Sequence, residues 1–296
     1  ATGERNVHIA GGGLNVSPQF LAPGRIAYLI KTRGSGTLAF TSGDESSPGD
    51  LANPSWSRDG TRVVYHAGQM ETMHHYSNTL GRPLSGTVAE PGFELVFASG
   101  WPAVSPDGRT LVVSERTPSD DRMALVMWDT DGSNPRRVYQ DDVTVMGLEW
   151  SRDGRWLSFG AGGFFLSRTS EPAKVMIMQA DGSEVRSVTS GPGNAGFPSW
   201  SPDGREIVYR YWSENERGEG LRIVNVATGR SRVLTTEYDT LPAWSPSGEV
   251  IMFTRYAPDD RFLYDEFDIY SIRPDGSGLK RLTDAEGNDA HSLWSP

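Results

Sequence analysis

Hydrophobic and polar residues alternate along most of the chain in short runs, and turn-forming residues separate these runs. Alternation of this kind is typical of half-buried β-strands, as in the run Arg205 to Tyr209. Most runs follow a short apolar segment that ends in tryptophan and then the turn phrase S-P/R-D-G, whose glycine supplies the positive φ of a tight reversal. Further along, an Asp-Gly hairpin joins two more runs. The pattern predicts units of four antiparallel strands.

The unit is repeated along the chain. Its first strand ends at an anchor position, and successive anchors lie 44 to 50 residues apart. This period is typical of the four-stranded blades of a β-propeller. The anchors are Trp56, Val104, Trp150, Trp200, Trp244 and Trp294.

The two ends of the chain complete one unit. Residues 25 to 43 align with the third and fourth strands, while HSLWSP at residues 291–296 matches a first strand. We therefore expect an all-β, six-bladed β-propeller of four-stranded antiparallel blades, closed by a C-terminal first strand that joins N-terminal second, third and fourth strands. Such closure removes an exposed sheet edge. The predicted blades are residues 1–52 with 291–296, 53–99, 100–146, 147–196, 197–240 and 241–290, and the third strand of the second is hard to place.

The W-S-P-D-G phrase, followed by I-x-Y/F and an Asp-Gly hairpin, resembles the PD40 repeats of the TolB-type β-propeller. The resemblance covers essentially the whole chain, but only the propeller part of TolB; we expect no counterpart of its N-terminal α/β domain. It implies a periplasmic role in protein interaction. Free-standing propellers of this kind also include polysaccharide lyases and binding proteins of unknown ligand, so the resemblance is more specific for fold than for function.

Composition narrows the classes of partner. The chain has 38 acidic and 28 basic residues, and this balance disfavours a nucleic-acid binder. It has no cysteine, which excludes disulfides and thiolate metal sites. No apolar run is long enough for a membrane-spanning helix. We expect an extracytoplasmic monomer, secreted or periplasmic, whose leader has been removed, although a cytosolic location stays open.

Two short motifs have structural interpretations. Asp107 and its counterparts in the S-P/R-D-G phrase are predicted to cap their own turns, despite a faint resemblance to sialidase Asp-boxes. The run Gly191 to Gly196 satisfies G-x-G-x-x-G but lies between two predicted strands. Because the dinucleotide fingerprint has to open a helix, we expect this run to be a loop.

Histidines give the first candidate site. All five histidines fall on the first two predicted blades of the closed ring. Grouped imidazoles suit proton transfer near neutral pH or binding of a divalent metal, here of the calcium or manganese class. We predict that four of them act as acid, base or metal ligands at the ends of their strands: His66, His74, His75 and His291.

Arginines and aromatic residues form the second part of the candidate site. They lie at the ends of the second strands of other predicted blades. Arg210 and Arg255 are predicted to hold a substrate carboxylate through their guanidinium forks, with Tyr211 and Tyr256 stacking on the substrate or transferring a proton. Further predicted substrate contacts are Glu115, Arg116 and Trp212.

These residue types favour an enzyme. A uronic acid is cleaved by β-elimination when a base removes the proton next to the acid group and a cation stabilises the developing charge. The sequence therefore predicts a carbon–oxygen lyase acting on an acidic oligo- or polysaccharide. The alternative is a non-catalytic module that docks a protein or peptide at the same place. The glycan and the identity of the metal stay open.

Overall fold

The computed structural model describes most of the chain. In the first hundred residues it describes only the backbone of the strands. The described backbone comprises residues 14–22, 25–32, 35–40, 51–56, 62–67, 70–72, 75–76, 84–87, 94–98, 101–116, 123–129, 133–142, 144–162, 172–213, 220–256, 267–283 and 294. Side chains are described from residue 103 onwards, apart from those of residues 115, 116 and 144. Within this part of the chain there are 25 β-strands and no helix.

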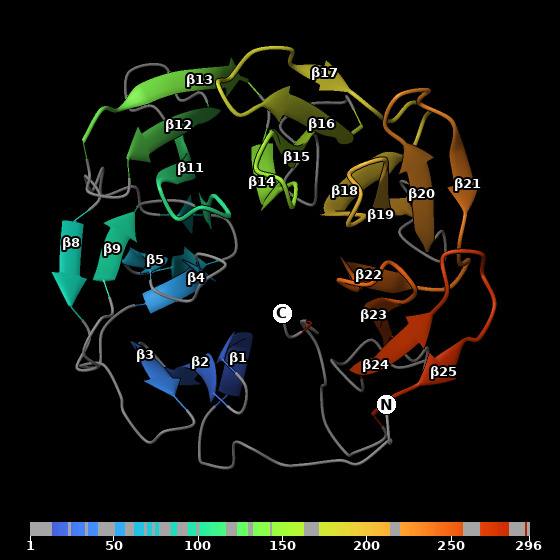
Figure 1. Ribbon diagram of the computed structural model, residues 1–296, viewed down its shortest axis with the longest axis horizontal. Coiled ribbons are helices and arrows are strands. Elements are labelled where there is room, and N and C mark those ends of the chain that lie inside the picture. The colour runs from blue at the N-terminus through green and yellow to red at the C-terminus, as the bar shows by residue number, and fades with distance from the viewer. Residues whose placement is uncertain are drawn as a thin grey trace.

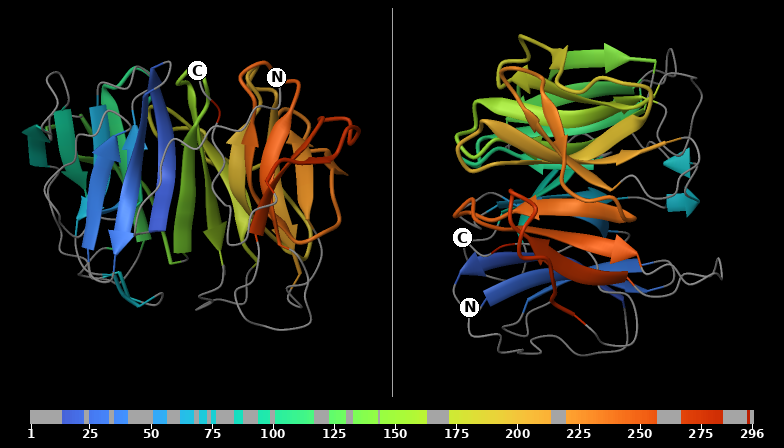
Figure 2. Two further views of the ribbon diagram at one scale, coloured as in Figure 1. Left: turned by 90° about the horizontal axis from the view of Figure 1, so that it is seen from below. Right: turned by 90° about the vertical axis from the view of Figure 1, so that its right-hand side faces the viewer.

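The sheets stand around a common centre, as in a propeller (Figure 1). Seen edge-on, their strands span the thickness of the molecule (Figure 2). Four sheets each contain four antiparallel strands in chain order. The first two are β10 (Trp101–Val104), β11 (Thr110–Arg116), β12 (Met123–Asp129) and β13 (Arg136–Asp141), followed by β14 (Thr144–Trp150), β15 (Trp156–Gly162), β16 (Lys174–Gln179) and β17 (Arg186–Ser187). The next two are β18 (Asn194–Trp200), β19 (Glu206–Trp212), β20 (Leu221–Asn225) and β21 (Ser231–Val233), followed by β22 (Asp239–Trp244), β23 (Ile251–Tyr256), β24 (Phe267–Ile272) and β25 (Lys280–Arg281).

The hydrophobic core lies between neighbouring sheets. Leu125 and Met127 of β12 pack with Leu157 and Phe159 of β15, and none of these side chains is exposed. Burying one such side chain contributes about 1.5–3 kcal/mol. The alternation along each strand therefore provides the free energy that holds one sheet against the next.

The anchor tryptophans tie the first strands of neighbouring sheets together. Each first strand from β10 to β22 contacts the next one along the chain. An anchor indole can then reach the carbonyl that precedes the previous anchor. Three indoles among the described side chains make this contact: Trp150 Nε1 donates to Ala103 O at 3.2 Å, Trp200 Nε1 to Glu149 O at 3.3 Å, and Trp294 Nε1 to Ala243 O at 2.9 Å. Trp294 therefore lies against β22 as Trp200 lies against β14.

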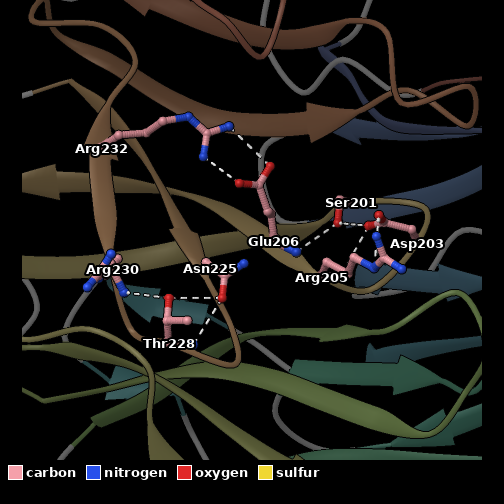
Figure 3. Close-up of polar contacts among 8 residues, drawn as sticks. All are labelled: Ser201, Asp203, Arg205, Glu206, Asn225, Thr228, Arg230 and Arg232. Atoms are coloured by element: carbon pink, nitrogen blue, oxygen red, sulfur yellow. Dashed lines mark hydrogen bonds and ion pairs between the residues drawn. The ribbon is translucent and has the colours of Figure 1, made fainter.

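The S-P/R-D-G turns have the predicted capping role. In the turn between β18 and β19, Ser201 Oγ donates to Asp203 Oδ1 at 2.7 Å, and the Arg205 amide donates to the same oxygen at 3.1 Å (Figure 3). The Glu206 amide donates to Ser201 Oγ at 2.9 Å. The hydrogen bond from Ser201 holds the pKa of the Asp203 carboxyl below its ordinary value. Ser105 with Asp107 and Ser151 with Asp153 form the same contacts, so these aspartates are turn caps.

Replacing Ser201 with alanine should lower the free energy of unfolding by about 1–2 kcal/mol, because the Asp203 carboxylate and the Glu206 amide each lose a partner. Urea denaturation measures this loss. The control is Arg205→Ala, since the Arg205 side chain is 83% exposed and should change stability by only a few tenths of a kcal/mol or less. Equal stability of Ser201→Ala and the wild type would show that the serine does not hold the turn.

The N-terminal sheet has three strands, β1 (Leu14–Ala22), β2 (Arg25–Thr32) and β3 (Ser35–Phe40), in the order β1-β2-β3. β2 and β3 cover the residues expected to be third and fourth strands. On its other edge β2 pairs with β1, which lies further along the chain than the N-terminal residues expected to supply a second strand. Residues 1–13 lie outside the described residues, as do residues 291–293, so closure of the ring stays a prediction.

The next sheet corrects the expectation of antiparallel strands throughout. It has the order β4 (Leu51–Trp56), β5 (Arg62–Ala67), β9 (Glu94–Ala98) and β8 (Leu84–Thr87), and β5 pairs with β9 in parallel. A parallel pair needs a long crossover connection, and the stretch from Ala67 to Glu94 provides one. Within that stretch β6 (Met70–Thr72) and β7 (His75–Tyr76) pair only with each other. The third position of this sheet, for which the sequence offered no clear strand, is thus occupied by β9.

Candidate functional site: an arginine–aromatic cluster

The candidate site lies at the end of two neighbouring sheets, where their second strands finish. β19 ends at Trp212, whose backbone faces Asn194 at the start of β18. β23 ends at Tyr256, which faces Phe267 at the start of β24, while Asp239 at the start of β22 faces the neighbouring Arg255. Register therefore brings the predicted residues of β19 to one end of their sheet, and those of β23 to the same end of the next.

Side chains from the two sheets meet there. The Arg210 guanidinium lies 4.9 Å from the ring centroid of Trp212 and 4.6 Å from that of Tyr238, which precedes β22. The Tyr238 and Tyr256 rings are 5.3 Å apart, and the Tyr256 and Phe267 rings are 5.0 Å apart. We name this group the arginine–aromatic cluster; it consists of Arg210, Trp212, Tyr238, Asp239, Arg255, Tyr256 and Phe267.

Arg255 is engaged by a carboxylate of the protein itself. Its Nε lies 2.7 Å from Asp239 Oδ1 and its second terminal nitrogen 2.8 Å from Asp239 Oδ2. The Asp239 side chain is completely buried, while that of Arg255 is 17% exposed. These hydrogen bonds raise the pKa of the Arg255 guanidinium above its ordinary value. The guanidinium fork that was predicted to hold a substrate carboxylate is thus occupied within the protein.

Arg210 and the two residues that follow it on β19 are also buried in the protein. Arg210 is 5% exposed, and Tyr211 and Trp212 are buried beside it. The Tyr211 hydroxyl accepts a hydrogen bond from the Gly193 amide at 3.0 Å. A Cβ atom on Gly193 would lie only 2.5 Å from that hydroxyl, so the approach requires glycine. Gly193 of the G-x-G-x-x-G run therefore packs against Tyr211. The run opens no helix, as expected, but the loop covers only residues 191–193, because the last three residues of the run begin β18 (Asn194–Trp200).

The cluster also has partly accessible aromatic rings. Tyr238, Tyr256 and Phe267 are each half-buried. Of these three, the sequence singled out only Tyr256. Tyr238 could have been found from its position, since it directly precedes a first strand and such connections face the end of the preceding blade's second strand.

The histidine prediction falls outside the described side chains. His66 lies in β5 and His75 in β7, whereas His74 and His291 lie outside the described residues. Glu115 and Arg116 end β11, at the equivalent end of their sheet, but their side chains are not described either. Among the described side chains, no group of three or more histidine, aspartate or glutamate residues could hold a metal ion. The predicted imidazole and metal sites remain predictions.

Comparison with known proteins establishes the family. A family model described as the TolB beta propeller domain matches residues 44–296. The chain belongs to this family. It is 32% identical over 187 residues to a protein TolB homolog of Chlorobium luteolum, across 59% of this chain and 41% of that protein. It is 26% identical over 255 residues to the uncharacterized protein Atu1656 of Agrobacterium fabrum, across 82% of this chain and 80% of that protein. The chain thus spans less than half the length of the TolB homolog.

Solved structures with the same fold have different functions. A putative TolB from Agrobacterium tumefaciens has a TM-score of 0.62 at 19% identity, over 99% of this chain and 90% of that one. An oligogalacturonate lyase in complex with manganese has a TM-score of 0.63 at 14% identity, over 87% and 73%. A puromycin hydrolase has a TM-score of 0.63 at 17% identity, over 92% and 47%. Identities this low show the fold of the TolB propeller and do not select among these functions. In the described part of the chain, no helix is long and apolar enough to cross a membrane.

Proposed function

We propose that this TolB-family propeller is a non-catalytic binding module that docks a protein or peptide at the arginine–aromatic cluster. The observation that carries the proposal is the state of the two arginines. Arg255 is neutralised by Asp239, and Arg210 is buried between two rings. The aromatic rings of Tyr238, Tyr256 and Phe267 remain partly accessible.

Such a surface suits protein recognition. Tyrosine and phenylalanine present a large contact area at a low cost in rotamer freedom, and aromatic residues are enriched at the centres of protein interfaces. Arg210 stiffens Tyr238, because its guanidinium lies within cation–π distance of that ring. Tyr238 in turn packs against Tyr256, and Tyr256 against Phe267. Membership of the TolB family supports this use and a periplasmic or other extracytoplasmic location.

Selection of a random peptide library on the immobilised protein tests the proposal. We expect an enriched consensus peptide whose affinity falls about tenfold or more in Tyr256→Ala and in Phe267→Ala. Arg155→Ala is the matched control, because this exposed arginine lies in the turn between β14 and β15, at the opposite end of its sheet. Failure to enrich a consensus, or equal affinity of Tyr256→Ala and the wild type, would count against docking at the cluster.

The second candidate is a polysaccharide lyase acting on a uronic acid. The observation in its favour is that Arg210, Tyr211, Arg255 and Tyr256 are at the same end of adjacent sheets, as a site for an acidic sugar requires. The fold shared with oligogalacturonate lyases supports it further. In this proposal His66, His74, His75 and His291 supply the acid, the base or the ligands of a divalent metal.

Ultraviolet absorbance of unsaturated products separates the two candidates. The protein is incubated with a panel of uronic-acid polysaccharides, with and without added calcium or manganese. A lyase would raise the absorbance, and His66→Ala or His291→Ala would abolish the increase. Since we favour the binding module, we expect no increase with any polysaccharide.

A further inference from the structure

Glu149 is an exception within the repeat. It lies on β14, directly before the anchor Trp150. The residues that directly precede the other five anchors are small or apolar: Ser55, Ala103, Ser199, Ala243 and Leu293. Glu149 is therefore the only charged residue type at this position, and the fold of the unit does not require it.

Its carboxyl joins two sheets at their innermost strands. Glu149 Oε1 accepts hydrogen bonds from the Trp200 amide at 3.2 Å and from Ser199 Oγ at 3.3 Å, both on β18. Ser199 Oγ itself accepts from the Trp244 amide of β22 at 3.2 Å. A chain of hydrogen bonds thus runs from β22 through β18 to β14. We name the contact of Glu149 with Ser199 and Trp200 the Glu149 joint.

The joint lacks a counter-ion among the described side chains. The neighbouring strands β10, β15 and β18 contain no ionisable residue. The polar contact that β15 makes with Glu149 is a hydrogen bond from Ser158 Oγ to the Glu149 backbone carbonyl at 3.2 Å. On the other strands packed against β14, ionisable residues occur only at the strand ends, as Glu115 and Arg116 of β11 and Asp129 of β12. In the described part of the chain, a negative charge at the joint would therefore be stabilised only by two neutral donors, the Trp200 amide and the Ser199 hydroxyl.

Burial decides the protonation state. Glu149 keeps some exposed surface, but the protein around its carboxyl raises the pKa to about 8, and the hydrogen bonds from Trp200 and Ser199 only partly oppose this rise. The group is thus mostly protonated near neutrality.

We propose that Glu149 is a proton-binding site that makes the joint between the β14–β17 and β18–β21 sheets pH-sensitive in the neutral range. With its proton, the carboxyl is a neutral bridge between the innermost strands. Without it, an uncompensated negative charge forms between the sheets and weakens their contact. The joint shares no residue with the arginine–aromatic cluster.

The direction of the pH effect follows from linkage. The folded protein keeps the Glu149 proton at pH values where the unfolded chain has already lost it. The stabilising contribution of the proton is complete below the ordinary pKa of a glutamate and is lost as the pH rises through about 8. The wild type should therefore become less stable between weakly acidic and weakly alkaline pH.

Thermal denaturation of the wild type and Glu149→Gln across this pH range tests the proposal. Glutamine keeps an oxygen to accept from Trp200 and Ser199 but does not ionise. We expect the wild-type melting temperature to fall by about 5 °C relative to Glu149→Gln as the pH rises. Glu184→Gln is the matched control, since Glu184 is exposed in a turn, and its profile should follow that of the wild type. Parallel profiles for Glu149→Gln and the wild type would overturn the proposal.

A titration read at the carboxyl itself guards against a variant that fails to fold. Carbon NMR of labelled glutamate side chains in the intact protein should show one carboxyl with a midpoint near 8. In Ser199→Ala the carboxyl keeps its burial but loses a donor that favours ionisation, so this midpoint should move to higher pH. If every glutamate carboxyl titrates in the ordinary acidic range, the joint does not bind a proton near neutrality.

Discussion

Replacing Arg255 with alanine should lower the free energy of unfolding by about 3–5 kcal/mol, because it leaves a buried carboxylate without its counter-ion. The Asp239 side chain has no exposed surface, and the Arg255 fork donates to both of its oxygens. Urea denaturation of the purified variant measures the loss. The same substitution should also disturb Tyr256, the next residue on β23, and so reduce any binding at the cluster.

Two comparisons distinguish this pair from an ordinary ion pair. The double variant Arg255→Met with Asp239→Leu removes both charges at once, and we expect it to recover most of the lost stability. Arg155→Ala breaks the exposed ion pair between Arg155 and Asp153, whose side chains are 79% and 44% exposed respectively. This substitution should lower the free energy of unfolding by no more than about 1 kcal/mol. An Arg255→Ala protein that unfolds at the wild-type urea concentration would contradict the assignment of a buried ion pair.

Deleting residues 291–296 should lower the free energy of unfolding by about 3–5 kcal/mol, the cost typical of removing a large aromatic side chain from a packed site. Trp294 is half-buried and donates to Ala243 O of β22, so the deletion uncovers the innermost strand of that sheet and removes this hydrogen bond. If these residues also close the ring, the truncated protein should unfold less cooperatively. Circular dichroism during urea denaturation measures both effects.

The control for this deletion is Trp294→Phe, which keeps most of the packing and removes only the indole N–H. We expect it to cost about 1 kcal/mol, the usual net value of one hydrogen bond. A truncated protein as stable as Trp294→Phe would show that the C-terminal segment contributes nothing beyond that hydrogen bond, and the predicted closure would then be wrong.

Residues that act within one unit could be assigned from the sequence. Strand alternation and the S-P/R-D-G phrase predicted the all-β propeller fold and the turn caps, since a serine, an aspartate and a glycine within a few residues satisfy one another locally. The position of Arg210 and Arg255 at the same end of neighbouring sheets was also predictable, because the repeat aligns the ends of their second strands.

The contacts made by those side chains required the tertiary structure. Arg255 and Asp239 are 16 residues apart, and only the register of β22 with β23 opposes them. Arg210 reaches Tyr238 of the next sheet, and Glu149 meets Ser199 and Trp200 fifty or so residues further on. The sequence by itself determined the elements, because their interactions are local and repeat. Only the packing of one sheet against the next decided which arginines are engaged, which rings stay accessible and which carboxyl has no counter-ion among the described side chains. Burial and charge pairing depend on residues that are distant in the chain.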